Sequence, residues 1–314
     1  MPDRAPDATA VSEMTLTSVK GLRVGHWTDR EARTGCTVIV LPEPNIASVE
    51  IRGAAPGSRE TALLEPGMKV DQIQAILLTG GSAFGLAAAD GVMARLEAEG
   101  RGHPTLMGPV PIVPAAVVYD LHLGSREFRP GSEQGAAAFD VAHEGPVEMG
   151  NVGAGTGATV AGWRGFEHVR WGGVGSAAVR VGDATVGALV VVNGVGDVFT
   201  LDGRALTGGP WEPGPPAFDQ RPLENTTLVV VATDARMQRT EVLRLAIRSQ
   251  DAVAACIRPS HTRYDGDAAF AVSCGVVETD LDGLGEAAFA ATGRAIGAAL
   301  READSGSPAD EVRV

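Results

Sequence analysis

Short runs of β-branched and other apolar residues recur along the chain, and each predicts a strand that is buried on both faces. Between several of these runs, apolar residues recur every three or four positions, which is helical spacing. Strands that alternate with helices in this way predict a layered α/β protein without internal repeats. The six strand-like runs occupy residues 37–41, 75–79, 115–119, 186–192, 227–232 and 268–274.

Three segments carry the clearest helical pattern. The first follows Gly85 and ends near Gly100, and the second is capped by Thr240 and stopped by Pro259. The third is an Ala-rich segment near the carboxyl end. The residues predicted to face inward are Leu86, Ala89, Met93 and Leu96, then Val242, Leu245, Ala246, Val253 and Cys256, and finally Phe289, Ile296 and Leu300.

Glycine is abundant and aromatic residues are scarce in this chain. Of 314 residues, 41 are glycine and only 4% are aromatic, while 44% are hydrophobic. The chain is long enough to bury a large core. We therefore expect close contact between backbones to replace the packing of bulky side chains.

The junction between a polar segment and a buried strand is the most informative feature. Residues 203–224 are crowded with Gly and Pro and predict an exposed linker. Asn225 and Thr226 follow, directly before the strand 227–232. The hydroxyl of Thr226 can attack the carbonyl of Asn225, and hydrolysis of the resulting ester would free an N-terminal threonine that carries its own amine base. The simpler alternative is a surface loop that enters a core strand.

Charge and cysteine content narrow the choice of partners. The net charge of −13 argues against nucleic acid or an anionic membrane surface. Lys20 and Lys69 are the only lysines, so amide hydrolysis needs a base of another kind. Three widely spaced cysteines favour neither a disulfide framework nor a zinc site, and we expect no metal or other cofactor.

The first residues and the longest apolar stretches of the chain indicate where in the cell the protein is expected. The first residues lack a basic region followed by an apolar one, and no apolar stretch is long enough to span a membrane. A cytoplasmic protein is therefore expected. Residues 1–15 and 304–314 are predicted to be flexible tails.

Two glycine-rich segments raise the alternative of a non-catalytic protein that binds a phosphorylated ligand. Residues 79–86 (TGGSAFGL) join a strand to a helix, as phosphate loops do, and residues 151–159 (NVGAGTGAT) contain a spacing found in dinucleotide-binding proteins. Neither segment contains Gly-Lys-Ser/Thr, and tight turns explain the glycines as well. Ser82 does not complete a nucleophile elbow, because Phe84 replaces the second glycine of that motif.

Two carboxylates follow the second predicted helix. Asp265 and Asp267 flank Gly266, and in an extended segment the period of two places both on one face. A strand, a helix and a returning strand would bring them beside the start of the strand at 227–232, where they can orient a threonine. Asn193 closes the strand 186–192, where a side-chain amide can act as an oxyanion donor. Ordinary turns are the alternative explanation for both features.

Taken together, these segments resemble one family over roughly residues 18–300, namely the L-aminopeptidase/D-esterases (DmpA-like), β-peptidyl aminopeptidases and nylon-oligomer hydrolases. The resemblance implies an N-terminal-nucleophile hydrolase with a single four-layer α-β-β-α domain over residues 1–314. It also implies a precursor that cuts itself into residues 1–225 and 226–314. The matching stretches are RVGHWTD, LLTGGSAFGL, AAVVYD, GNVGAGTGAT, ALVVVNGVGDV, ENTTLVVVATDA and IRPSHTRYDGDAAFAV.

The same resemblance implies roles for individual residues. Thr226 becomes both nucleophile and base, while Asp265 and Asp267 orient it and balance its charge. Asn193 is implied as the oxyanion donor, with Tyr119 as a second donor or a substrate contact. These residues form the catalytic set that we expect.

Further implications concern the substrate pocket, the substrate and the assembly. Ser82 and Phe84 are expected to line the acyl pocket. Relatives of the threonine type often carry a lysine where this chain has Gly162, and the nearby Arg164 cannot act as a base. We expect an aminopeptidase that acts on small peptides or amides, with an endo-acting amidase on polyamide oligomers as the alternative. The family also implies a homotetramer of processed heterodimers.

Overall fold

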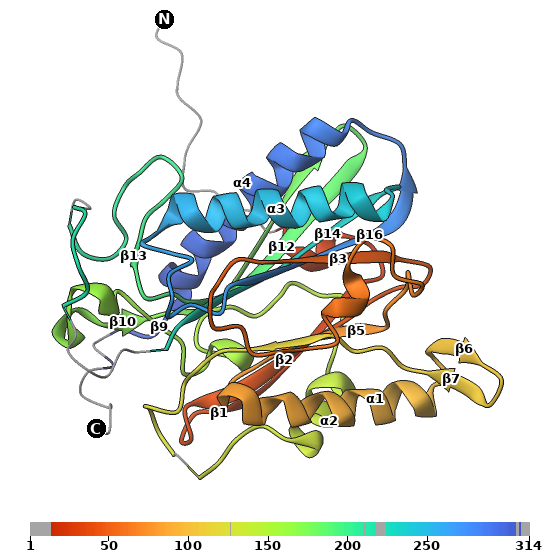
Figure 1. Ribbon diagram of the computed structural model, residues 1–314, viewed down its shortest axis with the longest axis horizontal. Coiled ribbons are helices and arrows are strands. Elements are labelled where there is room, and N and C mark those ends of the chain that lie inside the picture. The colour runs from red at the N-terminus through yellow and green to blue at the C-terminus, as the bar shows by residue number, and fades with distance from the viewer. Residues whose placement is uncertain (1–13, 126, 210–211, 218–223, 306–307, 309–314) are drawn as a thin grey trace, which may run out of the picture.

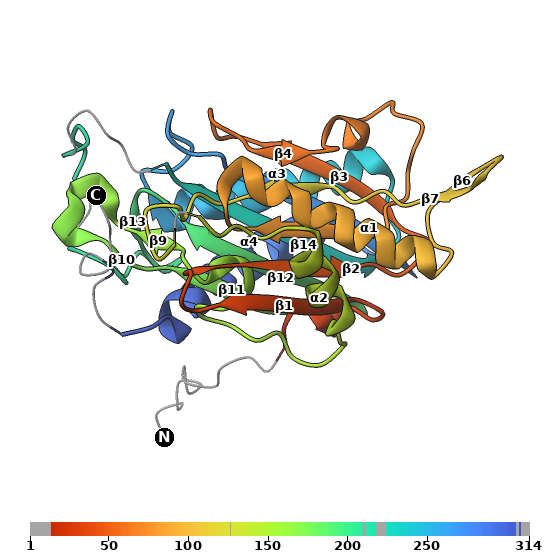
Figure 2. The ribbon, with the colours of Figure 1, turned by 90° about the horizontal axis from the view of Figure 1, so that it is seen from below.

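Two five-stranded sheets lie face to face between two pairs of helices in the computed structural model (Figure 1). The structure describes residues 14–125, 127–209, 212–217, 224–305 and 308. The first sheet has the strand order β1-β2-β5-β8-β4, and the second has the order β11-β12-β14-β16-β3. Helices α1 and α2 cover the outer face of the first sheet, and α3 and α4 cover that of the second (Figure 2). The predicted four-layer α-β-β-α sandwich is confirmed.

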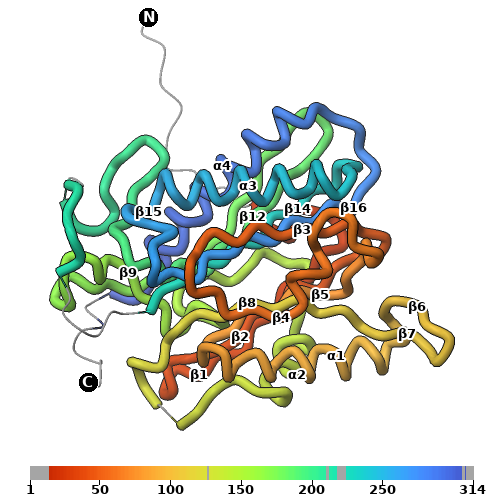
Figure 3. Tube along the Cα trace, viewed as in Figure 1, coloured from red at the N-terminus to blue at the C-terminus, as the bar shows by residue number. Residues whose placement is uncertain are grey.

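The strands of the first sheet are β1 (Arg23–Asp29), β2 (Thr34–Val40), β5 (Ala75–Thr79), β8 (Ala115–Val117) and β4 (Ser58–Arg59), of which β4 and β8 are best seen in Figure 3. Those of the second sheet are β11 (Gly173–Val181), β12 (Ala184–Asn193), β14 (Thr226–Ala235), β16 (Ala268–Val277) and β3 (Ile46–Ile51). The helices are α1 (Ala88–Ala98), α2 (Ser132–Asp140), α3 (Arg239–Cys256) and α4 (Leu281–Glu302).

Short elements complete the described part of the chain. Paired strands outside the two large sheets are β6 (His103–Thr105) with β7 (Gly108–Val110), β9 (Thr159–Val160) with β10 (Arg170–Trp171), and β13 (Asp197–Val198) with β15 (Ile257–Arg258). The 3-10 turns are η1 (Leu16–Ser18), η2 (Ala62–Leu64), η3 (Ser82–Ala87), η4 (Gly153–Gly155), η5 (Gly162–Arg164) and η6 (Phe166–His168).

The central strands are apolar along their whole length because both of their faces are buried. In β14, Leu228 and Val230 belong to the hydrophobic core between the two sheets, whereas Val229 and Val231 belong to the core beneath α3 and α4. Successive residues of a strand point to opposite faces, so a strand between two cores needs apolar residues at every position. The start of β14, and with it Thr226, is thereby buried between the layers.

All six predicted strands are present, with bounds that differ by a few residues. The predicted strand 115–119 ends at Val117, and beyond it the carbonyl of Val118 accepts the N–H of Ser82 in the segment after β5. The predicted helix cap at Thr240 is wrong. Gln238 is the N-cap of α3, and its N–H donates to the carboxylate of Glu241 at 2.7 Å. Strands β1, β3 and β11 and helix α2 were not predicted from the pattern.

Close contact between backbones does replace bulky side chains, as the composition predicted. A Cβ atom on Gly91 of α1 would lie 1.8 Å from the carbonyl oxygen of Ser132, and one on Gly175 of β11 would lie 2.0 Å from that of Ala295 in α4. Neither position can carry a side chain without moving the neighbouring element. Glycine therefore allows α1 to approach α2, and β11 to approach α4.

The predicted linker 203–224 is described at residues 203–209, 212–217 and 224, and its other residues lie outside the described part. Most of the described ones are exposed. Thr207 is an exception, because its hydroxyl donates to buried Asp197 at 3.0 Å.

No helix in the described ranges is long and apolar enough to cross a membrane.

The predicted tails are described only in part, since residues 1–13, 306–307 and 309–314 lie outside the described residues. At one end, the hydroxyl of Thr15 accepts the N–H of Val147 at 3.2 Å. At the other end, the N–H of Asp304 donates to the side chain of Asn151 at 2.6 Å. Residues 15 and 304 therefore belong to the folded body.

Candidate active site at the start of β14

The edge at which β14 begins brings together several of the predicted site residues. Asn193, the last residue of β12, is paired with Thr226, the first residue of β14. Strands β14 and β16 are parallel, so Asp267, which directly precedes β16, lies at the same edge. Asn225 and Asp265 form an isolated bridge beside them. The sequence prediction that a returning strand would bring the carboxylates to the start of this strand is confirmed.

The bond between Asn225 and Thr226 is buried and held by specific contacts. The hydroxyl of Thr226 donates to the carbonyl oxygen of Asn225 at 2.5 Å, and the N–H of Gly266 donates to the same oxygen at 3.0 Å. The side-chain amide of Asn225 donates to the backbone carbonyl of Asn193 at 3.0 Å. Asn225 and Thr226 are 3% and 5% exposed, so this junction is not a surface loop.

Gly266 cannot be replaced by a larger residue without disturbing this junction. A Cβ atom at position 266 would lie 2.8 Å from the Thr226 hydroxyl oxygen and 2.7 Å from the carbonyl oxygen of Ala55. The backbone N–H of Gly266 is a hydrogen-bond donor to this junction that the sequence pattern did not reveal. The Asp-Gly-Asp spacing was the available signal, since a glycine between two site residues often marks a close approach of the backbone.

Asp267 is buried and accepts three hydrogen bonds. One carboxylate oxygen accepts the N–H of Thr227 at 2.6 Å. The other accepts the backbone N–H of His261 at 3.1 Å and lies 2.7 Å from the ring nitrogen Nδ1 of the same residue. In the uncut chain Asp267 thus holds the residue next to Thr226. His261 was not among the predicted site residues.

Asp265 is equally buried but has different partners. Its carboxylate accepts the N–H and the hydroxyl of Thr262 at 2.8 Å and 2.7 Å. Burial, followed by the nearby charge of Asp267, raises the pKa of Asp265 to about 7. The two carboxylates, for which the sequence predicted a shared role, therefore differ in their hydrogen-bond partners.

Asn193 is completely buried, and its side-chain amide is fixed at both ends. The oxygen accepts the N–H of Thr159 at 2.8 Å, and the nitrogen lies 3.5 Å from the carbonyl oxygen of Tyr119. Tyr119 meets Asn193 through this backbone oxygen, while its ring stacks on that of His122 with centroids 5.8 Å apart. The amide nitrogen of Asn193 is thus oriented as a donor.

Ser82 and Phe84 lie on η3, which follows β5 of the first sheet. Ser82 has a left-handed backbone conformation, with φ of 54°. Phe84 is 62% exposed, and the guanidinium carbon of Arg129 lies over its ring, 4.4 Å from the ring centre. The residues predicted to line the acyl pocket are therefore placed on an accessible turn.

Asp120 anchors that turn and was not predicted from the sequence. Its two carboxylate oxygens accept the N–H of Gly81 and the hydroxyl of Thr34, both at 2.7 Å. Burial raises its pKa to about 6, although these hydrogen bonds act in the opposite direction. The available signal was its position directly after the predicted strand 115–119.

The glycine-rich segments do not form a phosphate cradle. In the first, the N–H of Gly81 is bonded to the Asp120 carboxylate, and a negative charge there would repel a phosphate. In the second, the N–H groups of Gly153, Ala154 and Thr159 donate to the side chains of Thr28, Thr37 and Asn193 at 2.8–3.0 Å. These donors are already used inside the protein, so a phosphorylated ligand finds little to bind.

Arg164 is held in an ion pair with a buried carboxylate. Its guanidinium forms two hydrogen bonds with Asp197, at 2.6 Å and 2.9 Å. Gly162 is buried in η5 beside it. This segment therefore has an ion pair of its own, directed toward the turn after β12.

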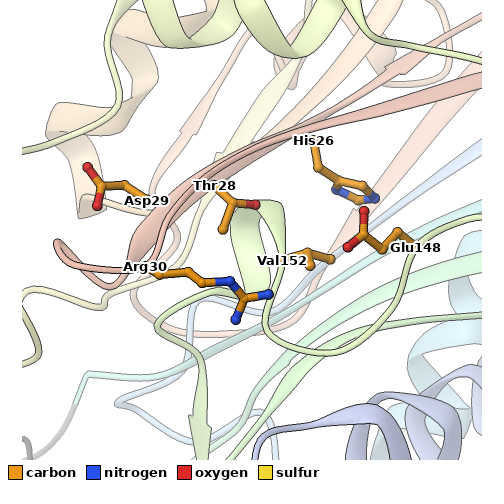
Figure 4. Close-up of a pocket in the computed structure, with 6 residues that line it drawn as sticks. All are labelled: His26, Thr28, Asp29, Arg30, Glu148 and Val152. Carbon is orange, nitrogen blue, oxygen red and sulfur yellow. The ribbon is translucent and has the colours of Figure 1, made fainter.

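A cavity of about 510 Å³ lies elsewhere on the first sheet and contains none of the predicted catalytic residues (Figure 4). Burial lowers the pKa of His26 in its wall to about 4. In the described ranges, no group of three or more His, Cys, Asp and Glu residues is placed to hold a metal ion. The cavity is lined by His26, Thr28, Asp29, Arg30, Glu148 and Val152.

Comparison with solved structures assigns the fold. The L-aminopeptidase D-Ala-esterase/amidase of Ochrobactrum anthropi, described as a prototype of serine aminopeptidases and a variant of the Ntn-hydrolase fold, gives a TM-score of 0.74 at 23% identity, over 98% of this chain and 92% of that chain. A β-aminopeptidase of Burkholderia sp. gives a TM-score of 0.73 at 23% identity, with the same coverage. The protein therefore has the Ntn (N-terminal-nucleophile) hydrolase fold, as the sequence predicted.

Sequence comparison assigns the family. The model of peptidase family S58 matches residues 15–313. An uncharacterized aminopeptidase of Mycobacterium leprae is 43% identical over 298 residues, covering 84% of this chain and 79% of the relative. A 6-aminohexanoate-oligomer endohydrolase of Paenarthrobacter ureafaciens is 32% identical over 290 residues, covering 86% and 78%. The chain belongs to peptidase family S58 and is an enzyme of the peptidase/amidase class, which confirms the resemblance seen in the sequence.

Proposed function

We propose that this protein is an N-terminal threonine hydrolase that cuts itself between Asn225 and Thr226 and then uses Thr226 to cleave amide bonds. The contact that carries the proposal is the 2.5 Å hydrogen bond from the Thr226 hydroxyl to the carbonyl oxygen of Asn225. It places the nucleophile beside the carbonyl group that it has to attack. Burial of the junction keeps water from competing for the hydroxyl.

Self-cleavage follows from this arrangement. The hydroxyl oxygen of Thr226 bonds to the carbonyl carbon of Asn225, the peptide C–N bond breaks, and the hydroxyl proton ends on the departing nitrogen. Negative charge develops on the carbonyl oxygen, to which the N–H of Gly266 donates at 3.0 Å. Water then hydrolyses the ester, which leaves a carboxylate on Asn225 and a free amine and hydroxyl on Thr226.

In the processed enzyme, the amine of Thr226 accepts the proton of its hydroxyl while the hydroxyl attacks a substrate carbonyl. Asn193 is the proposed oxyanion donor, because Thr159 holds its side-chain oxygen and thereby orients its nitrogen. Asp265 and Asp267 favour the charged form of the amine and position the chain around it.

The covalent state tests this proposal. Intact-mass analysis of freshly purified protein should show two chains, 1–225 and 226–314. Thr226→Ala should remain whole and inactive, whereas Thr226→Ser should still be cut, because serine keeps the hydroxyl and the amine. An active wild-type protein that consists of one uncut chain would refute the proposal.

We further propose an aminopeptidase that removes residues from small peptides or amides. A substrate ammonium near buried Asp265 and Asp267 would gain charge-assisted hydrogen bonds, worth roughly ten- to a hundredfold in affinity. The relative in Mycobacterium leprae is named an aminopeptidase, whereas that in Paenarthrobacter ureafaciens is named an oligomer endohydrolase. Both kinds of substrate therefore have to be compared.

A matched pair of substrates separates the two possibilities. The kcat/KM for an amino-acid p-nitroanilide with a free amine should exceed that for its N-acetylated twin by at least about tenfold. Equal values, or cleavage within a doubly blocked oligomer, would establish the endo-acting amidase instead.

We also propose a cytoplasmic homotetramer of processed heterodimers. All three cysteines are free, which is typical of a reducing compartment. The hairpin of β6 and β7 projects from the body, and Leu106 and Met107 at its tip are 101% and 94% exposed (Figure 2). Apolar residues on a projecting arm suit a contact between subunits. Light scattering on the eluting protein measures the assembly, and a monomeric mass would refute it.

A further inference from the structure

His261 occupies a strained position between β15 and β16, with contacts on both sides of its ring. Nδ1 lies 2.7 Å from a carboxylate oxygen of Asp267, and Nε2 lies 3.3 Å from the backbone carbonyl oxygen of Gln250 in α3. The backbone has φ of 56°, a left-handed conformation that is uncommon for a residue with a side chain. Such strain persists only where surrounding contacts enforce it.

The two contacts define the protonation state that fits the site. A backbone carbonyl oxygen only accepts hydrogen bonds, and so does a carboxylate. Either neutral tautomer of His261 would therefore direct a lone pair at one of these two oxygens. The imidazolium form donates to both, and it alone satisfies Asp267 and Gln250 together.

The charged groups around His261 act in opposite directions. Burial lowers the pKa of His261, but the hydrogen bond and the charge of Asp267 outweigh it, so that the pKa lies above its usual value. Arg52, which follows β3, works against the imidazolium, and Asp265 works in its favour. Arg52 is itself paired with Glu50 at 3.1 Å and Asp251 at 3.0 Å.

We propose that His261, as an imidazolium, is the positioning residue of this active site. It fixes and charge-balances the Asp267 carboxylate, whose other oxygen holds the N–H of Thr227 at 2.6 Å and so places Thr226. This inference rests on the proposed role of Thr226 and assigns the two carboxylates different tasks. Asp267 is the anchored partner of His261, whereas Asp265 is held by the N–H and the hydroxyl of Thr262.

The pH profile follows from this arrangement. As pH rises through the pKa of His261, the imidazolium is lost and Asp267 faces a neutral ring. The value of kcat/KM should therefore fall on the alkaline side. The amine of Thr226 gives a separate limb on the acid side, because its protonation removes the base. Wild-type enzyme should show both limbs.

Two substitutions separate the charge of His261 from its shape. His261→Asn keeps a donor close to the position of Nδ1 and tolerates a left-handed backbone, but it carries no charge. His261→Ala removes donor and charge together. His168→Asn is the control, since His168 is partly exposed on η6 and lies 3.6 Å from the carboxylate of exposed Glu167.

His261→Ala should lower kcat by roughly ten- to a hundredfold, the effect of one charge-assisted hydrogen bond, with little change in KM. His261→Asn should recover part of the rate and keep the acid limb, while its alkaline limb disappears. His168→Asn should match the wild type in rate and profile. A His261→Asn enzyme that keeps the alkaline limb, or a His261→Ala enzyme with wild-type kcat, would overturn the inference.

Proton NMR of the histidine ring C–H groups provides a test that does not depend on activity. The resonance absent from His261→Asn should titrate above the ordinary pKa of 6.5 and should move down in Asp267→Asn. A resonance that titrates below 6.5 would overturn the inference. An uncut, active wild-type chain would instead refute the proposed role of Thr226, so the two failures are distinguishable.

Discussion

Asp120 and Asp267 are both buried carboxylates near the end of a strand, and each holds a backbone N–H with one of its oxygens. Asp120 accepts the N–H of Gly81 and, with its other oxygen, the neutral hydroxyl of Thr34. Asp267 accepts the N–H of Thr227 and, with its other oxygen, lies against the ring of His261. The main difference is the second partner, a neutral group in one site and a titratable one in the other.

This difference in partner matches a difference in use. A buried carboxyl group without a cation is easily protonated, and the pKa of Asp120 is accordingly raised to about 6 by burial. It serves to fix the turn that carries Ser82. Asp267 instead lies against the ring of His261 and holds the residue next to Thr226, the proposed nucleophile. Burial of a carboxylate alone does not mark an active site, whereas its partners do.

The largest effect is expected from the carboxylates beside Thr226. Asp267→Asn places an amide nitrogen against the donors of His261, so kcat/KM should fall by at least about 10²-fold. Asp265→Asn resembles the protonated acid already present below its pKa of about 7, so at pH 6 it should cost less than about tenfold. Above pH 7 the loss should grow.

The kcat/KM of both variants, measured at pH 6 and at pH 9, tests this difference between the two carboxylates. Near-normal rates for Asp267→Asn would assign the Asp-Gly-Asp triplet to an ordinary turn. Equal losses in the two variants at both pH values would remove the distinction between the carboxylates.

A second effect is expected on self-cleavage. Gly266→Ala introduces a Cβ atom 2.8 Å from the Thr226 hydroxyl oxygen, which has to shift away from Asn225. Processing should slow by at least about tenfold, because small displacements of reacting groups are costly. Gly214→Ala is the matched control, since no atom lies within 4 Å of an added Cβ atom there. The fraction of uncut chain is followed over time for both variants. Equal rates of processing in Gly266→Ala and Gly214→Ala would contradict the proposed geometry.

A third effect, on stability and not on rate, concerns the Asp120 site. The pKa of Asp120 is about 6 in the folded protein and 3.8 as its ordinary value, so the folded state binds the extra proton between these values. Stability should therefore fall as pH rises from about 4 to 6, by roughly 3 kcal/mol from this group. Asp120→Asn removes this contribution because an amide does not titrate, and its oxygen can still accept the N–H of Gly81.

Urea unfolding of the uncut Thr226→Ala protein at several pH values checks this expectation, with and without Asp120→Asn. Asp265 contributes a slope of the same sign up to about pH 7, so the pH dependence should become shallower and not vanish. An unchanged slope would show that Asp120 does not titrate in this range.

Sequence pattern alone predicted a layered α/β protein and the strand end beside which the two carboxylates lie, whereas the four-layer arrangement came from the family resemblance. Strands with two buried faces need apolar residues throughout, and this pattern made β12, β14 and β16 recognisable from their residues alone. A strand, a helix and a returning strand bring two strand ends to one edge, so Asp265 and Asp267 could be placed beside the start of β14 from their order in the chain, whereas the place of Asn193 in the site came from the family resemblance. The relevant information was local, in residues next to the strands that carry them.

Only the tertiary structure decided which groups those residues touch. The Asp120 clamp joins Thr34 and Gly81, which come from separate segments of the first sheet. The proposed protonation state of His261 depends on the backbone carbonyl of Gln250 in α3 as well as on Asp267. Hydrogen bonds between distant segments depend on how the layers pack, to within a few tenths of an ångström. No periodicity in the sequence records such distances, and for this reason the partners of each carboxylate emerged only from the fold.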